Sequence, residues 1–271
     1  MGDRLMQLNL MKHFKLDKYQ ISLEHLFVNN GIPLDAFFKT LIISPIWSPF
    51  DFVSLRKFIS KAYHDRIFVL QIAGNDITFI KTGMGVSVFN DLLLSALCVD
   101  KIKRAVFIGT AGAVNESINI GNVLLPTDAG LYSHFFDFIE SDSLNEDNII
   151  YHSSSKNEWE RMIKAKKAIG IEDDCDNEKA VVFTVPSLLG EYRHLNQINA
   201  LGFHAIDMEM AAFYGACKMC GVDATGLLLI TDNSVTKHTI YHQQSLLQKQ
   251  KVLEGKRMLI NILCQFINNN K

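Results

Sequence analysis

Residues 225–230 read Thr-Gly-Leu-Leu-Leu-Ile, an apolar run that ends at the polar residues Thr231 and Asp232. Similar short runs occur at Arg104-Ala-Val-Phe-Ile108 and Ala180-Val-Val-Phe-Thr-Val185. Strands as apolar as these are typical of a sheet that is buried on both faces, and such sheets are usually parallel. The sequence therefore predicts an α/β protein with a central mixed, largely parallel sheet, covered by helices in a three-layer α/β/α arrangement.

The segments around these runs alternate between extended and helical patterns, without a Pro-, Gly- or Ser-rich linker. Further strands are predicted at 40–44, 67–72, 77–80 and 120–125, helices at 50–63, 86–98, 159–169, 206–220 and 243–267, and a polar loop at 139–155. We therefore expect one domain over residues 39–271, preceded by a helical or irregular extension over residues 1–38.

Composition excludes several classes of protein. The 271 residues include 27 Lys and Arg against 29 Asp and Glu, so no basic surplus favours nucleic acid or an anionic membrane as partner. No apolar run approaches the roughly 20 residues that span a bilayer, and residues 1–18 show no secretory signal pattern. The five cysteines are odd in number and scattered, which favours reduced thiols. We expect a cytoplasmic protein.

Cys217-Lys-Met-Cys220 is a cysteine pair with the spacing of metal ligands. A zinc site needs a second pair of ligands, and the sequence offers neither another such pair nor a His-Glu-x-x-His motif. Inside a helical apolar pattern, cysteine usually behaves as a small buried hydrophobic residue. We therefore expect no metal site and no cofactor.

Small residues follow the apolar run at 104–108, in the stretch Gly109-Thr-Ala-Gly-Ala113. Such residues after a strand leave backbone N–H groups free to bind an anion or a sugar hydroxyl, and the Thr110 hydroxyl can both donate and accept a hydrogen bond. The alternative is a tight turn whose dihedral angles only glycine adopts. The stretch is thus a candidate binding element.

Two acids lie close together in Ala205-Ile-Asp-Met-Glu-Met-Ala-Ala212, at the start of a predicted helix. The helix dipole is a sufficient explanation for one acid there, but Glu209 is flanked by Met and Ala. A buried carboxylate needs partners, and two adjacent hydroxyls of a ligand would supply them at roughly 1.5–3 kcal/mol for each hydrogen bond. Glu209 is therefore a candidate ligand-binding residue.

Asp232 directly follows a predicted core strand, so it lies at the edge of the sheet where ligands of α/β proteins bind. It could serve as a general acid there. The alternative is an Asp that caps a helix or stabilises a turn.

Together with Gly83-Met-Gly85, which precedes a predicted helix, the elements 109–113, 207–212 and 230–232 resemble the nucleoside phosphorylase/nucleosidase superfamily over about residues 39–268. This superfamily includes purine nucleoside phosphorylases, uridine phosphorylase and methylthioadenosine nucleosidase. The resemblance implies phosphorolysis of a nucleoside, most often a purine one, to the free base and a pentose 1-phosphate, with inorganic phosphate as co-substrate. Hydrolysis by water is one alternative, and a binding or storage protein without turnover is another.

The resemblance also implies a role for each matched residue. Glu209 would bind the 2′- and 3′-hydroxyls of ribose, and Asp232 would protonate N7 of the purine as the glycosidic bond breaks. General acid catalysis contributes typically 10²–10⁴-fold in rate. The other positions expected in the site are Met208 packed on the sugar, Thr110 between the sugar and the nucleophile, Gly109 and Gly85 at the phosphate or water, Asp207, Leu188 and Phe183 around the substrate, and His25 at the ribose 5′-hydroxyl of a neighbouring subunit.

The sequence departs from the family pattern where phosphate would bind. The turn after the first strand reads Ser44-Pro-Ile-Trp-Ser48, without the expected Arg, and Phe107 occupies the position of a second Arg. Arg56 could substitute, and Asp51 is the nearest acid that could activate water. Leu188 stands where a base-stacking aromatic residue is common. The resemblance further implies a homo-oligomer, either a dimer or a hexamer, with sites completed across the interface.

Overall fold

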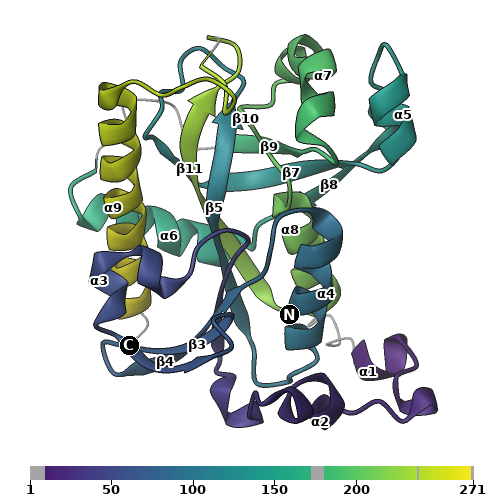
Figure 1. Ribbon diagram of the computed structural model, residues 1–271, viewed down its shortest axis with the longest axis vertical. Helices are drawn as coiled ribbons and strands as arrows, with labels where there is room; N and C mark the ends of the chain where they lie inside the picture. The colour runs from purple at the N-terminus through teal and green to yellow at the C-terminus, as the bar shows by residue number, and fades with distance from the viewer. Residues whose placement is uncertain (1–9, 172–179, 237, 270–271) are drawn as a thin grey trace.

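The computed structural model describes residues 10–171, 180–236 and 238–269. At its centre is β5 (Arg104–Ala113), which pairs in parallel with β1 (Thr40–Ser44) on one side and with β11 (Asp223–Asn233) on the other. The last residues of β5 pair antiparallel with β10 (Ala205–Asp207). The long strand β5 therefore joins two halves of one mixed, largely parallel sheet, as the sequence predicts (Figure 1).

The remaining strands extend this sheet in both directions. Outward from β1 they are β4 (Asn75–Lys81), β3 (Ile67–Ile72) and β2 (Ile59–Tyr63); outward from β10 they are β9 (Ala180–Thr184), β7 (Pro126–Tyr132) and β8 (Ile149–Ser153); and β6 (Val123–Leu124) pairs with β11. The strands predicted at 67–72 and 77–80 are confirmed as β3 and β4, which form an antiparallel hairpin.

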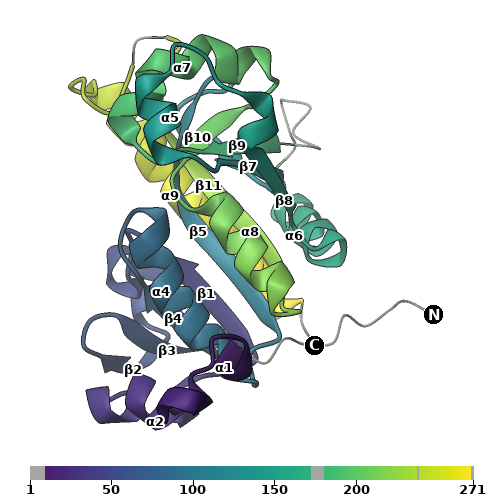
Figure 2. The same ribbon diagram turned by 90° about the vertical axis from the view of Figure 1, so that its right-hand side faces the viewer.

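Helices cover both faces of the sheet (Figures 1 and 2). The helices are α4 (Val86–Leu97) and α8 (Met210–Met219) on one face, and α6 (Lys156–Ala168) and α9 (Leu246–Asn268) on the other. The apolar core is divided in the same way: Phe107 and Phe213 belong to the α4/α8 side, and Leu229 and Phe266 to the α9 side. The three-layer arrangement is thus confirmed.

The part of the N-terminal extension that the structure describes is a chain of short helical turns. They are α1 (Leu10–His13), η1 (Asp17–Tyr19), α2 (Leu23–Leu26), η2 (Val28–Asn30) and η3 (Leu34–Ala36). Leu10, Phe27 and Phe37 are almost fully buried in the same core cluster as the α4/α8 side of the sheet. The extension is therefore packed against the domain, at the end where α1 and α2 lie in Figure 2.

The predicted helix at 50–63 is wrong. Its residues form η4 (Pro49–Asp51), the short α3 (Val53–Arg56) and the edge strand β2. The Arg56 Nε donates to the Phe50 carbonyl oxygen at 2.6 Å, and the Ser60 hydroxyl donates to Val69 of β3 at 3.1 Å. Pairing with β3 therefore outweighs the helical spacing of the apolar residues, because packing against a neighbouring strand overrides a weak local preference.

Two further segments differ from the prediction. The strand expected at 120–125 is reduced to β6, and Pro126 begins β7 instead of ending a strand, which a proline tolerates at a first strand position. The predicted loop at 139–155 contains the end of α5 (Phe135–Glu140), η5 (Glu146–Asn148) and β8. Strand β8 pairs with β7 at the sheet edge, a long-range contact that a polar local pattern does not reveal.

Candidate active site

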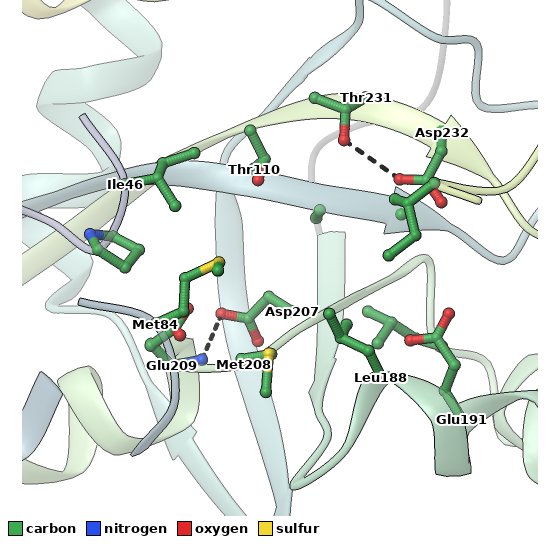
Figure 3. A pocket seen from close by; sticks show the side chains of 15 residues that line it. Ile46, Met84, Thr110, Leu188, Glu191, Asp207, Met208, Glu209, Thr231 and Asp232 are labelled. Atoms are coloured by element: carbon green, nitrogen blue, oxygen red, sulfur yellow. Dashed lines mark hydrogen bonds between the residues drawn. The ribbon is translucent and has the colours of Figure 1, made fainter. Parts of the chain in front are cut away.

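A pocket lies where β5, β10 and β11 meet the loop after β1 and the start of α7 (Leu188–Ala200) (Figure 3). Its volume is ≈ 160 Å³, close to the about 150 Å³ of a cavity that admits benzene. The pocket therefore has room for a small molecule with at least one ring. The lining residues are Pro45, Ile46, Met84, Thr110, Ala111, Gly112, Leu188, Glu191, Ile206, Asp207, Met208, Glu209, Thr231, Asp232 and Ile240.

The strand does not end at Ile108 as expected, because β5 continues through residues 109–113 and pairs there with β11. Binding of an anion or a sugar hydroxyl by this stretch stays a prediction. A side chain at Gly109 would meet the Phe107 ring at 2.6 Å, so packing in the core requires glycine at this position. Gly109 is not among the lining residues, whereas Thr110 is. The strand therefore brings the Thr110 side chain to the pocket without forming a loop.

Asp207 is the last residue of strand β10. The helix predicted at 206–220 therefore begins later than expected, and Asp207 is not part of it. Its Oδ2 accepts the N–H groups of Glu209 and Met210 at 2.9 and 2.6 Å, and its Oδ1 accepts the Thr184 hydroxyl at 2.7 Å. These bonds hold the carboxylate at the positive end of α8. Asp207 thus positions Glu209, and its direct contact with a substrate stays a prediction.

Glu209 is the N-terminal cap residue of α8 and is only 4% exposed. The Gly85 N–H donates to its Oε1 at 2.6 Å, so Gly85 binds Glu209 and is not among the lining residues. Burial raises the pKa of Glu209, and the Asp207 charge raises it further. A ligand that donates hydrogen bonds to this carboxylate would relieve the cost of its burial.

Asp232 lies within β11, where a bulge shifts the register against β5. The Thr231 hydroxyl donates to its Oδ1 at 3.1 Å. A side chain at Gly112 would come within 3.0 Å of Asp232 Oδ2, so this glycine makes room for the carboxyl. Burial raises the pKa of Asp232 from 3.8 to about 6. The carboxyl therefore keeps its proton more readily than an exposed aspartate, as a general acid must.

Glu191 is a lining residue that the sequence analysis missed. It lies in the first turns of α7, a helix that was not predicted, and is 4% exposed. Burial and the negative charge of Asp232 raise its pKa to about 8, while a hydrogen bond with Ser234 opposes the shift. Its signal in the sequence is a Glu directly after Leu188-Leu-Gly, an apolar context like that of Glu209.

The acids occupy two ends of the pocket (Figure 3). Asp207 and Glu209 lie at one end, and Asp232 lies at the other, with Glu191 on its side. Thr110 lies between the two ends. The arrangement can accept hydrogen bonds from adjacent hydroxyls at one end and donate a proton at the other.

Several predicted residues lie elsewhere. Phe183 is fully buried in the core, with its ring 4.8 Å from that of Phe203, so it is not at the pocket. His25 is exposed on α2, where its Nδ1 accepts the Ser22 N–H at 3.0 Å. It does not line the pocket of its own chain, and a contact with a neighbouring subunit stays a prediction. Asp51 accepts hydrogen bonds from Ser48 and is also outside the lining.

In the described ranges, no three His, Cys, Asp or Glu side chains are placed so that they could hold a metal ion. Cys217 and Cys220 are both buried in the core, where burial raises the pKa of each thiol. None of the helices in these ranges combines the length and the apolar character required to cross a membrane.

Comparison with known families gives a match over most of the chain. Residues 51–267 match the family described as the Phosphorylase superfamily. Among curated relatives, a DeoD-type purine nucleoside phosphorylase of Clostridium perfringens is 26% identical over 164 residues, which are 60% of this chain and 66% of that protein. The chain thus spans about two thirds of that relative. A protein of the same name from Streptococcus thermophilus is 26% identical over 171 residues, 60% of this chain and 71% of that protein.

Solved structures show the same fold at lower identity. The 5′-methylthioadenosine/S-adenosyl homocysteine nucleosidase of Campylobacter jejuni has a TM-score of 0.67 at 14% identity, over 86% of this chain and 99% of that one. Purine nucleoside phosphorylase from Toxoplasma gondii, in complex with immucillin-H, has a TM-score of 0.65 at 18% identity, over 89% and 94%.

Proposed function

The chain belongs to the phosphorylase superfamily, and from this premise we propose that it is an enzyme that cleaves the N-glycosidic bond of a purine nucleoside. One observation carries the proposal: two buried carboxyls with raised pKa values, Glu209 and Asp232, lie at opposite ends of one small pocket. The separation suits a sugar at one end and a base at the other.

The proposed reaction places charge where the pocket can stabilise it. Breaking the glycosidic bond leaves positive charge on the sugar and an electron pair on the base. Glu209 accepts hydrogen bonds from the 2′- and 3′-hydroxyls and, when ionised, stabilises the cationic sugar, by the logic that applies to glycoside hydrolysis. Asp232 gives its proton to the base. The base departs neutral, which lowers the barrier by roughly 3–5 kcal/mol.

Apolar side chains support a heterocyclic base at the Asp232 end. Leu188 and Ile240 line the pocket together with Met208, and each can pack against the face of a planar ring. The curated relatives are named purine nucleoside phosphorylases, which favours a purine. Leu188 therefore substitutes for a stacking aromatic residue in this proposal.

Either phosphate or water could accept the sugar when the glycosidic bond breaks, and different observations support each. Phosphate, the first candidate, is favoured by the names of the curated relatives. Water is favoured by the lining, which holds four acids and, among the described residues, neither Lys nor Arg. Phosphate is bound most strongly by guanidinium groups, and the position after β1 that would supply one is occupied by Pro45 and Ile46.

The test is release of free base from inosine, adenosine, guanosine, uridine and methylthioadenosine, each with and without phosphate. Asp223→Asn is a matched control for Asp232→Asn, because Asp223 is an exposed acid on the same strand. Phosphate-dependent release identifies a phosphorylase, and release without phosphate identifies a hydrolase. Binding of nucleosides without release in any assay would contradict the proposal and leave a binding protein.

We also propose that the chain forms a homo-oligomer, either a dimer or a hexamer. Large apolar side chains are exposed at the pocket and beside it: Met84 is 62% exposed and Leu189 of α7 is 74% exposed. Contact with a second copy would bury them at a gain of roughly 25 cal/mol per Å². Light scattering that gives the mass of a single chain would contradict this expectation.

A further inference from the structure

Asn233 is the last residue of β11 and is only 4% exposed. Its amide nitrogen Nδ2 donates to two backbone carbonyls of the connection between β5 and β6, at 3.1 Å to Asn115 and at 3.0 Å to Ile118. Its oxygen Oδ1 accepts the N–H groups of Val235 and Thr236, each at 3.1 Å. The side chain therefore uses both of its donors and both of its acceptor positions.

The backbone at the same residue folds the chain back after β11. Asn233 and His238 exchange two backbone hydrogen bonds at 2.9 and 3.1 Å, and the Thr236 hydroxyl donates to the Asn233 carbonyl at 3.2 Å. Neither an ionised aspartate, which has no donor, nor an apolar side chain could replace the amide in its four contacts. Asn233 therefore joins the chain after β11 to a segment that lies 115 residues or more away in the sequence.

The chain that Asn233 folds back returns to the pocket at Ile240, which is one of the lining residues. There the Ile240 N–H donates to the Asp232 carboxyl. The same carboxyl accepts the Thr231 hydroxyl at 3.1 Å (Figure 3), and the Gln244 Nε2 donates to the Thr231 carbonyl at 2.8 Å. The Asp232 carboxyl is thus held partly by a segment whose path begins at the neighbouring residue, Asn233.

We propose that Asn233 is a positioning residue, which holds the Ile240 segment against Asp232 and so keeps the carboxyl where it can give its proton to the leaving base. The proposal rests on the proposed function, because it needs a base that departs from a sugar. Asn233 does not line the pocket, so it acts through Asp232 and not by contact with the substrate. A misplacement of about 1 Å can cost 10²-fold in rate, so a tether of this kind has a measurable effect.

The proton balance is that of the proposed reaction. The glycosidic bond breaks, its electron pair goes to the base, and the Asp232 proton is transferred to that base. The acceptor, whether it is water or hydrogen phosphate, forms a bond to the sugar and releases one proton, which returns to Asp232. Asn233 gains and loses no proton in these steps.

The first test measures the tether without catalysis, by hydrogen exchange and mass spectrometry of peptides that contain Ile240. The full-length wild type is compared with Asn233→Ala and with Asn145→Ala, a matched control whose Oδ1 accepts the N–H of Asp147 at 3.1 Å outside the pocket lining. Exchange at Ile240 should be about tenfold faster in Asn233→Ala, because a hydrogen bond is lost, and unchanged in Asn145→Ala. Equal exchange in wild type and Asn233→Ala would overturn the proposal.

A second variant covers the case in which Asn233→Ala does not fold. In Asn233→Ser the hydroxyl can still accept an N–H of the turn, although more weakly than an amide oxygen, while the contacts with Asn115 and Ile118 are lost. Its exchange at Ile240 should lie between those of wild type and Asn233→Ala, and wild-type exchange would count against the tether in the same way.

The second test is a double-mutant cycle on base release. In the wild-type background, Asn233→Ala should lower kcat roughly 10–100-fold, whereas Asn145→Ala should not. In the Asp232→Asn background, the same Asn233→Ala substitution should lower kcat less than about threefold, because no proton remains to be positioned. A residue that merely stabilises the fold would lower kcat by the same factor in both backgrounds.

The outcomes separate the two proposals. An equal loss in both backgrounds, or no loss in the wild-type background, would overturn Asn233 as a positioning residue. If the wild-type protein releases no base from any nucleoside, the proposed function fails, and the role of Asn233 in proton donation fails with it. The exchange at Ile240 would in that case still decide whether Asn233 holds this segment against Asp232.

Discussion

Replacing Asp232 by Asn should make the protein more stable at alkaline pH while it removes the proton donor. The substitution keeps the shape of the side chain, and its oxygen can still accept the Thr231 hydroxyl, which lies 3.1 Å from Asp232 Oδ1. A Cβ on residue 112 would lie 3.0 Å from Asp232 Oδ2, so glycine at this position provides the space that the carboxyl occupies. The Ile240 N–H also donates to the Asp232 carboxyl, so Asn should fit the site with the loss of at most one of these two hydrogen bonds.

The size of the stability effect follows from the pKa. Burial raises the Asp232 pKa from 3.8 to about 6, so the folded protein binds this proton more tightly than the unfolded chain does. The stabilisation that results is fully present below pH 3.8 and is lost as the pH rises through about 6. A shift of about two units at 1.36 kcal/mol each costs the wild type about 3 kcal/mol at pH 8. Asn does not ionise and avoids this cost.

The assay is urea denaturation of wild type, Asp232→Asn and Asp223→Asn at pH 4 and pH 8, combined with turnover at both values. The free energy of unfolding of Asp232→Asn, relative to wild type, should increase by about 3 kcal/mol between pH 4 and pH 8, whereas Asp223→Asn should follow the wild type. Turnover of Asp232→Asn should fall 10²–10⁴-fold. A relative stability that is the same at both pH values would refute the assignment of Asp232 as a buried, protonated acid, and normal turnover would refute its role as proton donor.

Three further substitutions test the rest of the site. Glu209→Gln should weaken nucleoside binding by roughly 10–100-fold, because a hydrogen bond to a charged group contributes roughly 1.5–3 kcal/mol; isothermal calorimetry measures this, and unchanged affinity would remove Glu209 from the sugar site. Gly112→Ala should reduce turnover with little change in melting temperature, because its Cβ displaces the Asp232 carboxyl; normal kinetics would contradict that geometry. Asp207→Ala should lower the free energy of unfolding by about 1–3 kcal/mol, because it leaves the Thr184 hydroxyl and two N–H groups at the start of α8 without their acceptor; urea denaturation at wild-type stability would refute this.

Residue type and spacing predicted the elements whose burial is evident from the local sequence. The apolar runs at 104–108, 180–185 and 225–230 were predicted to be buried strands, and they lie in β5, β9 and β11. Glu209 stood out because it is flanked by apolar residues, and it lines the pocket together with Asp207. An acid among apolar residues can be recognised as a candidate binding residue from the sequence alone, because burial of a charge without a partner is costly wherever it occurs.

Pairing between strands could not be predicted in the same way. The residues at 59–63 have a helical apolar spacing, but the hydrogen bonds offered by β3 make them a strand. Gly109 is of a residue type that is common in loops, but it lies in strand β5 and pairs there with β11. Glycine is needed at this position because a Cβ would meet the Phe107 ring. In both cases a neighbouring strand, β3 or β11, decides the conformation, and the local pattern does not show that this strand pairs with the segment.

The sequence by itself predicted a layered α/β domain from its alternating apolar runs, and its motifs resembled the family that residues 51–267 match. It also singled out Glu209, by its apolar neighbours, and Asp232, by its position after a core strand. Only the tertiary structure decided that Glu191 and Asp232 line the same pocket, that Asp207 fixes the start of α8 and that Gly112 makes room for the Asp232 carboxyl. The physical reason is that a pKa and a close contact depend on which groups meet in space. The crossing of β5, β10 and β11 brings these groups together.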